Sequence, residues 1–403
     1  MLSFLHVITN WLEGALGESL TPIVRRNMYM ELCSSLAFGI FTVAGLQFVP
    51  VLLRRWGASP GELAIYIAQS YIGLVITPFS ILLMRGWRPQ KFAALCWFVG
   101  RATLLGFALV HNVFWALVIT GIYWTIESFP SPAYSHIFQT IYPERIRGQV
   151  ASIVRLGMAG AMLVTAPLAG WALDHWGSTV QIPLAALFGW LAVWFFYRLK
   201  VAEGSLPANK TQSLSTLWEI VRKDRRYAVH LLAVAVYGLG ALAGSPLYPI
   251  VQVDRLNLSY SWLGTLSLVQ SLLWLIGLAL WGRLIDRRGA SWVFRLNLLV
   301  AICVPTTYIF ATNGWMLLPA FMAQGIISAG IDLSFLNTCI QLADREKVLE
   351  YSAIQSTVIG LRGMAGSFVG AGLQQIGFTQ TMVFATGVVL IFLSWLIHRR
   401  IRV

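Results

Sequence analysis

The chain alternates long apolar runs with short polar stretches. Five runs lack charged residues, and each has the roughly 20 residues that a helix needs to cross a bilayer; they cover 32–53, 63–84, 176–197, 231–253 and 256–282. Two longer runs, 296–331 and 363–397, exceed one crossing. A turn signal interrupts each of them, Thr312-Asn313-Gly314 in the first and Gly377-Phe378-Thr379-Gln380 in the second, so each predicts two spans.

Three further spans are predicted where an apolar run carries a single charge. They cover about 92–110, 113–140 and 150–173, and the charges are Arg101, Glu127 and Arg155. A chain crosses a bilayer either as helices or as a closed barrel, and runs of this length favour helices. The pattern therefore predicts an all-α integral membrane protein with twelve transmembrane helices.

The composition agrees with this prediction. Hydrophobic residues make up 57% of the 403 residues and charged residues 11%, against about 25% charged in soluble domains. The net charge of +13 would suit nucleic acid only on a soluble domain with a basic face, so no nucleic-acid partner is expected. The four cysteines lie in different apolar segments without metal-ligand spacing, and the six histidines are scattered. No metal or bound cofactor is predicted.

The positive charges predict the orientation in the membrane. If the N-terminus is cytoplasmic, cytoplasmic segments hold 23 of the 29 Lys and Arg residues, and only Arg54, Arg55 and Arg255 lie outside. Cytoplasmic loops of membrane proteins carry this excess. We therefore expect a multi-pass protein of the cell membrane with both termini in the cytoplasm.

The apolar pattern also divides the chain into four parts. Residues 1–26 lack a span-length run and are predicted to lie on the cytoplasmic membrane surface. Two six-helix bundles, 27–199 and 227–403, follow, and the cytoplasmic linker 200–226 joins them. One surface helix is predicted within the linker, near 214–221.

The two bundles repeat each other in sequence. Phe38-Gly39, Gly45 and Pro50 recur as Tyr237-Gly238, Gly244 and Pro249 at a constant offset of 199, Asn112 matches Asn313, Glu127 matches Asp332, and Gly157-Met158-Ala159-Gly160 matches Gly363-Met364-Ala365-Gly366. The offset rises along the chain without reversing, as expected of a duplicated six-helix unit. Pseudo-two-fold symmetry between the bundles is therefore predicted.

The loop after the eighth predicted span carries a recognisable motif. Gly282, Leu284, Asp286, Arg287 and Gly289 match the Gly-x-Leu-x-Asp-Arg-x-Gly loop of the major facilitator superfamily, and the chain resembles those transporters over about residues 27 to 400. The resemblance implies that Gly282, Asp286, Arg287 and Gly289 form a cytoplasmic latch between the bundles. It also implies transport by alternating access and no enzymatic activity.

Charges within apolar spans are candidate functional sites, because a charge there is costly unless it is paired or hydrated. In the family that the chain resembles, spans four and ten line the cavity, so Glu127 and Asp332 are expected to face it and to carry protons. Arg155 and Arg362 are predicted to pair with these acids, and Arg101 is expected to be structural. The alternative is that all these charges form permanent ion pairs between helices.

The residues around Glu127 favour a binding site. Pro130 and Pro132 follow it and remove helix hydrogen bonds, which leaves carbonyl groups free. The residues predicted to line the substrate cavity are Phe38, Gln47, Tyr123, Trp124, Tyr237 and Tyr248. The alternative for each aromatic residue is ordinary packing.

We therefore expect a monomeric, proton-coupled secondary transporter of a small molecule, embedded in the lipid bilayer. The many aromatic residues allow an amphipathic substrate, and Ala166-Pro167-Leu168-Ala169-Gly170 loosely resembles an exporter motif. A uniporter or lipid translocator is the first alternative. An integral-membrane enzyme is a remote one, since no loop carries clustered acids or paired histidines.

Overall fold

The computed structural model describes residues 14, 20–84, 86–201, 214–343 and 347–401, and its regular elements are helical throughout this part of the chain. The helices before the linker are α2 (Pro22–Thr42), α3 (Val49–Arg55), α4 (Pro60–Leu83), α5 (Pro89–Thr103), α6 (Val113–Ser128), α7 (Ser131–Ile141), α8 (Glu144–Trp176) and α9 (Ser178–Tyr197). A π-helical turn, η1 (Val43–Gln47), joins α2 to α3, and a 3-10 turn, η2 (Leu104–Ala108), follows α5.

The helices from the linker onward form the second half. They are α10 (Leu214–Lys223), α11 (Arg225–Ala243), α12 (Tyr248–Ile250), α13 (Tyr260–Arg288), α14 (Ala290–Ala301), α15 (Cys303–Phe310), α16 (Leu318–Leu342), α17 (Val348–Gln375) and α18 (Gln380–Arg399). Short turns η3 (Ser245–Leu247) and η4 (Val251–Arg255) flank α12, and η5 (Gly314–Leu317) precedes α16.

The turn signals that divided the long apolar runs act as helix caps. Asn313 accepts a hydrogen bond from the Met316 backbone N–H (3.1 Å) before α16, and Thr379 accepts one from Met382 (3.3 Å) before α18. Asn112 caps α6 in the same way. Such side chains satisfy the first free N–H groups of a helix, so each signal starts a new span.

Ten helical segments of the described chain are long and apolar enough to cross a membrane. They correspond to the predicted spans except the second and the eleventh, which are α4 and α17. In α4 the apolar part, Pro60–Ile76, is shorter, and α17 contains Arg362 and several glycines. These two helices pack against each other between the halves, where polar and small residues are tolerated.

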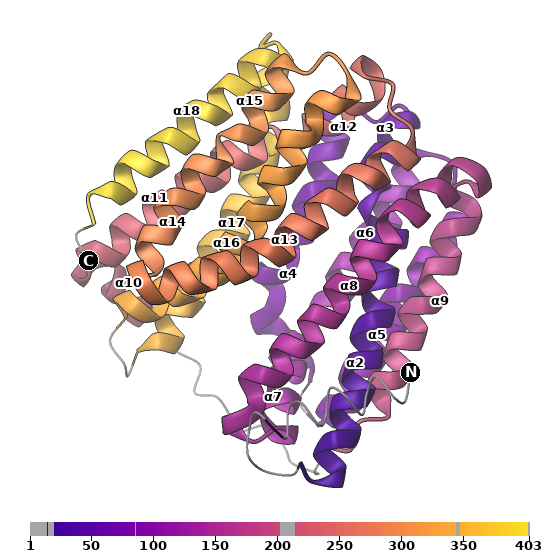
Figure 1. Ribbon diagram of the computed structural model, residues 1–403, viewed down its shortest axis with the longest axis vertical. Helices are drawn as coiled ribbons and strands as arrows, with labels where there is room; N and C mark the ends of the chain where they lie inside the picture. The colour runs from indigo at the N-terminus through magenta and orange to yellow at the C-terminus, as the bar shows by residue number, and fades with distance from the viewer. Residues whose placement is uncertain (1–13, 15–19, 85, 202–213, 344–346, 402–403) are drawn as a thin grey trace.

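The two halves lie side by side and are built alike (Figure 1). In the first half α2 packs against α8 and α9, and in the second α11 packs against α17 and α18. The matched glycines have the same function in both. A Cβ on Gly39 would lie 2.7 Å from the Met158 carbonyl of α8, and one on Gly238 would overlap Arg362 of α17. The repeat therefore preserves a close helix approach.

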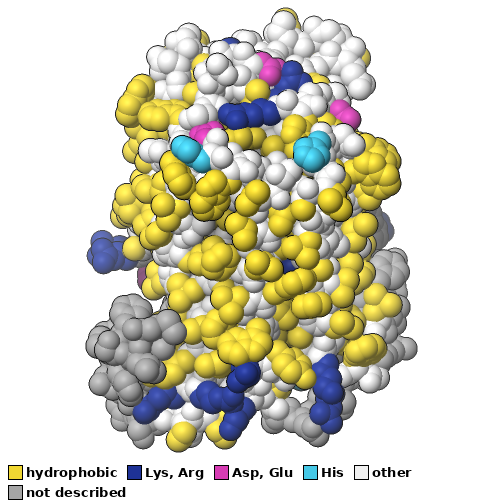
Figure 2. Space-filling view, turned by 90° about the vertical axis from the view of Figure 1, so that its right-hand side faces the viewer, with side chains coloured by type: hydrophobic (Ala, Val, Ile, Leu, Met, Phe, Trp, Pro, Cys, Tyr) yellow, Lys and Arg dark blue, Asp and Glu magenta, His cyan; other side chains and the backbone are white. Residues whose placement is uncertain are grey.

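The bundle has two distinct ends. We call the end where α2 begins and α18 ends the terminal end, and the opposite end, near α3 and α12, the far end (Figure 1). On the face in Figure 2, apolar side chains cover the middle. Lys and Arg side chains gather at the terminal end without acidic side chains among them, whereas at the far end they lie beside Asp and Glu side chains. This distribution is that of a membrane protein with its positive end at the termini.

The predicted surface segment 1–26 falls largely outside the described residues, and within it α2 already begins at Pro22. In the linker, α10 covers Leu214–Lys223, so a helix lies where one was predicted. Its place on the membrane surface stays a prediction. The rest of the linker, from 202 to 213, also lies outside the described residues.

Candidate functional site

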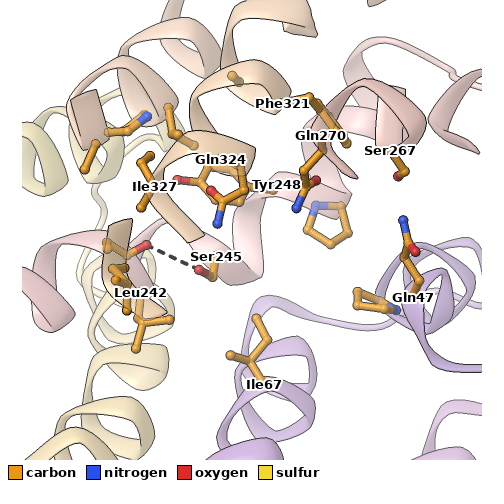
Figure 3. Close-up of a pocket in the computed structure, with 18 of the residues that line it drawn as sticks. Gln47, Ile67, Leu242, Ser245, Tyr248, Ser267, Gln270, Phe321, Gln324 and Ile327 are labelled. Carbon is orange, nitrogen blue, oxygen red and sulfur yellow. Dashed lines mark hydrogen bonds between the residues drawn. The ribbon is translucent and has the colours of Figure 1, made fainter. Parts of the chain in front are cut away.

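A cavity of about 820 Å³ lies between the two halves. Residues of α2 to α4, α6 and α8 form its wall on one side, and residues of α11 to α18 form it on the other. Figure 3 shows Gln47 reaching toward it from the first half, and Gln270 and Gln324 from the second. The volume is that of a typical small-molecule site.

Four glutamines line this cavity, and three of them are free to bind a ligand. Gln252 donates from Nε2 to the Tyr308 hydroxyl (2.7 Å). The side-chain amides of Gln47, Gln270 and Gln324 have no hydrogen-bond partner within the described chain. Each amide offers two donors and an acceptor. A polar ligand could therefore bind amides from both halves at once.

Charged side chains join the two halves at the far end. Arg54 of α3 pairs with Asp254 of η4, with Nε 3.0 Å from Oδ2. Arg55 donates to the Leu258 carbonyl (2.7 Å), and its guanidinium lies 3.7 Å from the centre of the Tyr260 ring.

Asp174, at the end of α8, adds a contact between the halves by accepting hydrogen bonds from the first residues of α13. The Tyr260 N–H donates to it at 3.1 Å and the Ser261 N–H at 2.7 Å. A carboxylate is favourable at a helix N-terminus.

Helices α8 and α13 touch backbone to backbone near this end. A Cβ on Gly264 would lie 2.5 Å from the Ala166 carbonyl, and one on Gly170 would overlap the Tyr260 carbonyl. Away from this contact the two helices splay apart toward the terminal end (Figure 1). The cavity is thus closed at the far end.

The structure places the predicted cavity residues in two groups. Gln47, Trp124, Tyr237 and Tyr248 line the cavity.

Phe38 and Tyr123 are absent from its wall and pack inside the first half. Tyr123 is 1% exposed and contacts Phe41, and Phe38 lies against the Arg101 guanidinium at 4.8 Å. Periodicity along one helix could not separate the two groups, because neighbouring helices decide which face meets the cavity.

The prediction that Glu127 pairs with Arg155 was wrong. Its carboxylate pairs with Arg101 of α5, with Nη2 2.8 Å from Oε1 and Nε 3.3 Å from Oε2. Arg101 also donates to the Gly189 carbonyl (2.9 Å), so it bridges α5, α6 and α9. Only 12% of the Glu127 side chain is exposed, and it does not line the cavity. Arg155 on α8 is exposed and takes no part in this pair.

Asp332 and Arg362 also do not pair. Asp332 on α16 is exposed and accepts a hydrogen bond from the Trp274 indole (3.2 Å). Arg362 instead donates to the Val234 carbonyl of α11. Arg155, on the other half, is the cation close enough to act electrostatically on Asp332.

The latch residues lie at the terminal end of α13. Asp286 and Arg287 are exposed, and Gly289 turns the chain into α14 with a φ of +81°, a conformation that favours glycine. A Cβ on Gly289 would still have 3.4 Å to the Gln341 amide, and Gly282 has open space around it. With the halves splayed apart here, the latch contact stays a prediction for the state closed at this end.

Sequence reasoning missed Gln270, Gln324 and Tyr71, which line the cavity. For the two glutamines the available signal was an amide within a long apolar run, because an amide is costly to bury without a partner. The sequence signal that we used was a full charge within a span, and two of those charges, Arg101 and Glu127, satisfy each other.

Comparisons with known proteins agree with this geometry. The sequence pattern described as Major Facilitator Superfamily matches residues 28–311. A mutant of the nucleoside transporter NupG superposes with a TM-score of 0.71 at 12% identity, over 93% of this chain and 98% of that one.

A second solved structure is a bacterial homologue of the human lysosomal transporter Spinster, in an inward-facing and unoccupied conformation. It has a TM-score of 0.63 at 14% identity, over 94% of this chain and 96% of that one. The search of curated proteins finds no match to the chain. At these identities the likenesses show the fold.

Proposed function

The chain belongs to the major facilitator superfamily, and we propose that this membrane transporter is a secondary active carrier of a small polar molecule. In alternating access, the two halves rock about a central site that opens to one side at a time. A cavity between the halves, closed at the far end, suits one state of that cycle.

The observation that carries the proposal is the set of three unpartnered amides. Gln47 belongs to the first half, and Gln270 and Gln324 belong to the second. A ligand that hydrogen-bonds to both sets favours the approach of the halves, since closure would bury these amides and a buried amide without a partner is costly. Binding energy is thereby linked to the conformational change.

The cavity wall supports a ring-bearing substrate. Trp124, Tyr237, Tyr248 and Phe321 line it together with the amides. Flat polar rings stack on aromatic faces and exchange paired hydrogen bonds with amides. Nucleosides have this chemistry, and NupG, which shares the fold, is a nucleoside transporter.

We further propose that the terminal end faces the cytoplasm of the cell and that one chain is the working unit. The positive charges at that end support the orientation. A single chain supplies both walls of the cavity, which supports a monomer. Export stays a prediction from the motif at Ala166 to Gly170.

Transport of a neutral ring compound tests the proposal. Proteoliposomes containing the protein are expected to take up labelled uridine faster than protein-free liposomes. Replacing Gln270 or Gln324 by leucine should weaken apparent affinity about 3- to 10-fold, because each change removes one or more hydrogen bonds. Gln375→Leu is the control, since Gln375, the last residue of α17, is exposed and does not line the cavity. Equal uptake with and without protein, across uridine, sugars, aromatic amides and anionic counterparts of these compounds, would contradict the proposal.

Proton coupling is part of the proposal, with Asp332 as the carrier. Asp332 is exposed and takes part in no ion pair within the described residues, whereas Glu127 is held by Arg101. Closing the terminal end would bring α8 and α16 together, and Arg155 would then meet Asp332. A proton on Asp332 abolishes its charge and so competes with this pair.

Asp332→Asn is accordingly expected to abolish uptake driven by a pH gradient and to leave uridine exchange at symmetric pH intact. The exposed Glu219 of α10, which pairs with Lys223, supplies the control variant Glu219→Gln. Uptake should be measured between pH 6 and 8 in both variants. Unchanged accumulation by Asp332→Asn would favour the uniporter alternative.

A further inference from the structure

The cavity wall is positively charged. Arg362 is the only Asp, Glu, Lys, Arg or His among its described lining residues. Glu127 points to Arg101 inside the first half, and Asp332 does not line the cavity. The wall therefore carries one cation and no counter-ion, although the membrane interior penalises an isolated charge.

The hydrogen bonds of Arg362 are incomplete. Nη1 donates to the Val234 carbonyl, and Nε is buried without a partner. The rings of Tyr237 and Phe335 lie 5.4 Å and 5.3 Å from the guanidinium carbon, which offsets part of the desolvation. Nη2 has no hydrogen-bond partner within the described chain, so this group can still bind a ligand.

The surrounding helices make space for this guanidinium. A Cβ on Gly238 of α11 would overlap Cδ of Arg362, with Nε at 2.7 Å. A Cβ on the next residue of α17, Gly363, would overlap the ring of Tyr71 on α4. Tyr71 also lines the cavity, so Arg362 lies where the first half meets the second.

We propose that Arg362 binds an anionic group of the substrate, a carboxylate or a phosphate, while the glutamine amides bind its polar ring. This inference rests on the proposed function and adds the sign of the substrate's charge. A guanidinium presents a fork of donors that matches both anions. The anion supplies the missing counter-ion, and release of the anion restores an unpaired cation in the wall.

Pairs of probes that differ in charge test this inference. The soluble pairs are uridine 5′-monophosphate with uridine, and 4-hydroxybenzoate with 4-hydroxybenzamide. The lipid pair is a lysophosphatidate with the matching monoacylglycerol. Binding to the purified full-length protein can be followed by tryptophan fluorescence, because Trp124 lines the cavity. In the wild type, the anionic member of at least one pair should bind about 10- to 100-fold more tightly.

Arg362→Met should lower the affinity for that anionic member to the affinity for its neutral partner. Arg362→Lys should retain part of the preference for the anion. Arg222→Met is the matched control, because Arg222 of α10 is an exposed arginine outside the cavity wall. The wild-type comparison needs no variant, so it holds even if Arg362→Met folds poorly.

The outcomes separate the two proposals. A preference confined to the lipid pair identifies a lipid headgroup as the source of the anion, and one in the soluble pairs identifies a soluble metabolite. Equal binding of charged and neutral members, or a preference that survives Arg362→Met, would overturn the role of Arg362 and leave the transporter proposal intact. Binding and transport of none of the six probes would overturn both.

Discussion

Replacing Arg101 by methionine is expected to lower the free energy of unfolding by about 3–5 kcal/mol, because Glu127 is left as an unpaired charge in a nearly dry site. Arg101 is 4% exposed, and the rings of Phe38, Phe41 and Trp97 lie within 5.4 Å of its guanidinium. Water cannot replace the lost partner there.

The double variant Arg101→Met/Glu127→Met should be more stable than either single variant. Apolar residues of similar volume often replace a buried pair at little cost, since neither charge then needs solvation. Unfolding in mixed micelles, followed by circular dichroism, measures all three variants against Arg155→Met, which changes an exposed side chain. Additive losses in the double variant would show that the two charges do not depend on each other.

Gly264→Val is expected to shift the conformational equilibrium toward a state open at the far end. A Cβ here would lie 2.5 Å from the Ala166 carbonyl and 3.1 Å from the Pro167 Cα, and backbone cannot move aside as a side chain can. Overpacking of this kind costs about 1–3 kcal/mol, which corresponds to roughly 5- to 150-fold in the population of the closed far end.

Distances between spin labels at His111 and Thr312, exposed residues near the far end in opposite halves, report this shift. The native cysteines Cys33, Cys96, Cys303 and Cys339 would first be replaced. Gly160→Val on α8 is the control, because a Cβ there meets nothing within 4 Å. A distance distribution unchanged by Gly264→Val would mean that the contact between α8 and α13 does not hold the far end closed.

The helical framework could be read from local patterns. Apolar runs of span length, and the caps Asn313 and Thr379 that divide the two longest runs, act within a few residues of themselves. The offset repeat predicted that Gly39 and Gly238 would have equivalent surroundings, and both lie against the last helix but one of their half. Such features depend on neighbours along the chain and on a duplicated pattern.

The pairing of charges required the tertiary structure. Glu127 could have met any arginine at similar depth, and its partner is Arg101 because α5, α6 and α9 converge on one point inside the first half. A one-residue rotation of a helix turns its side chains by about 100°, so sequence position leaves the facing side undecided. The same uncertainty separated Gln47 and Tyr248, which line the cavity, from Phe38 and Tyr123, which do not.

The sequence by itself determined that this protein is a helical membrane protein with two similar halves and belongs among the major facilitators, because hydrophobic length, charge bias and a loop motif are properties of contiguous residues. Only the tertiary structure decided that the cavity is lined by amides and one unpaired arginine, and that the acids lie elsewhere. Those facts depend on the rotation and crossing of helices, which are set by packing between segments up to two hundred residues apart.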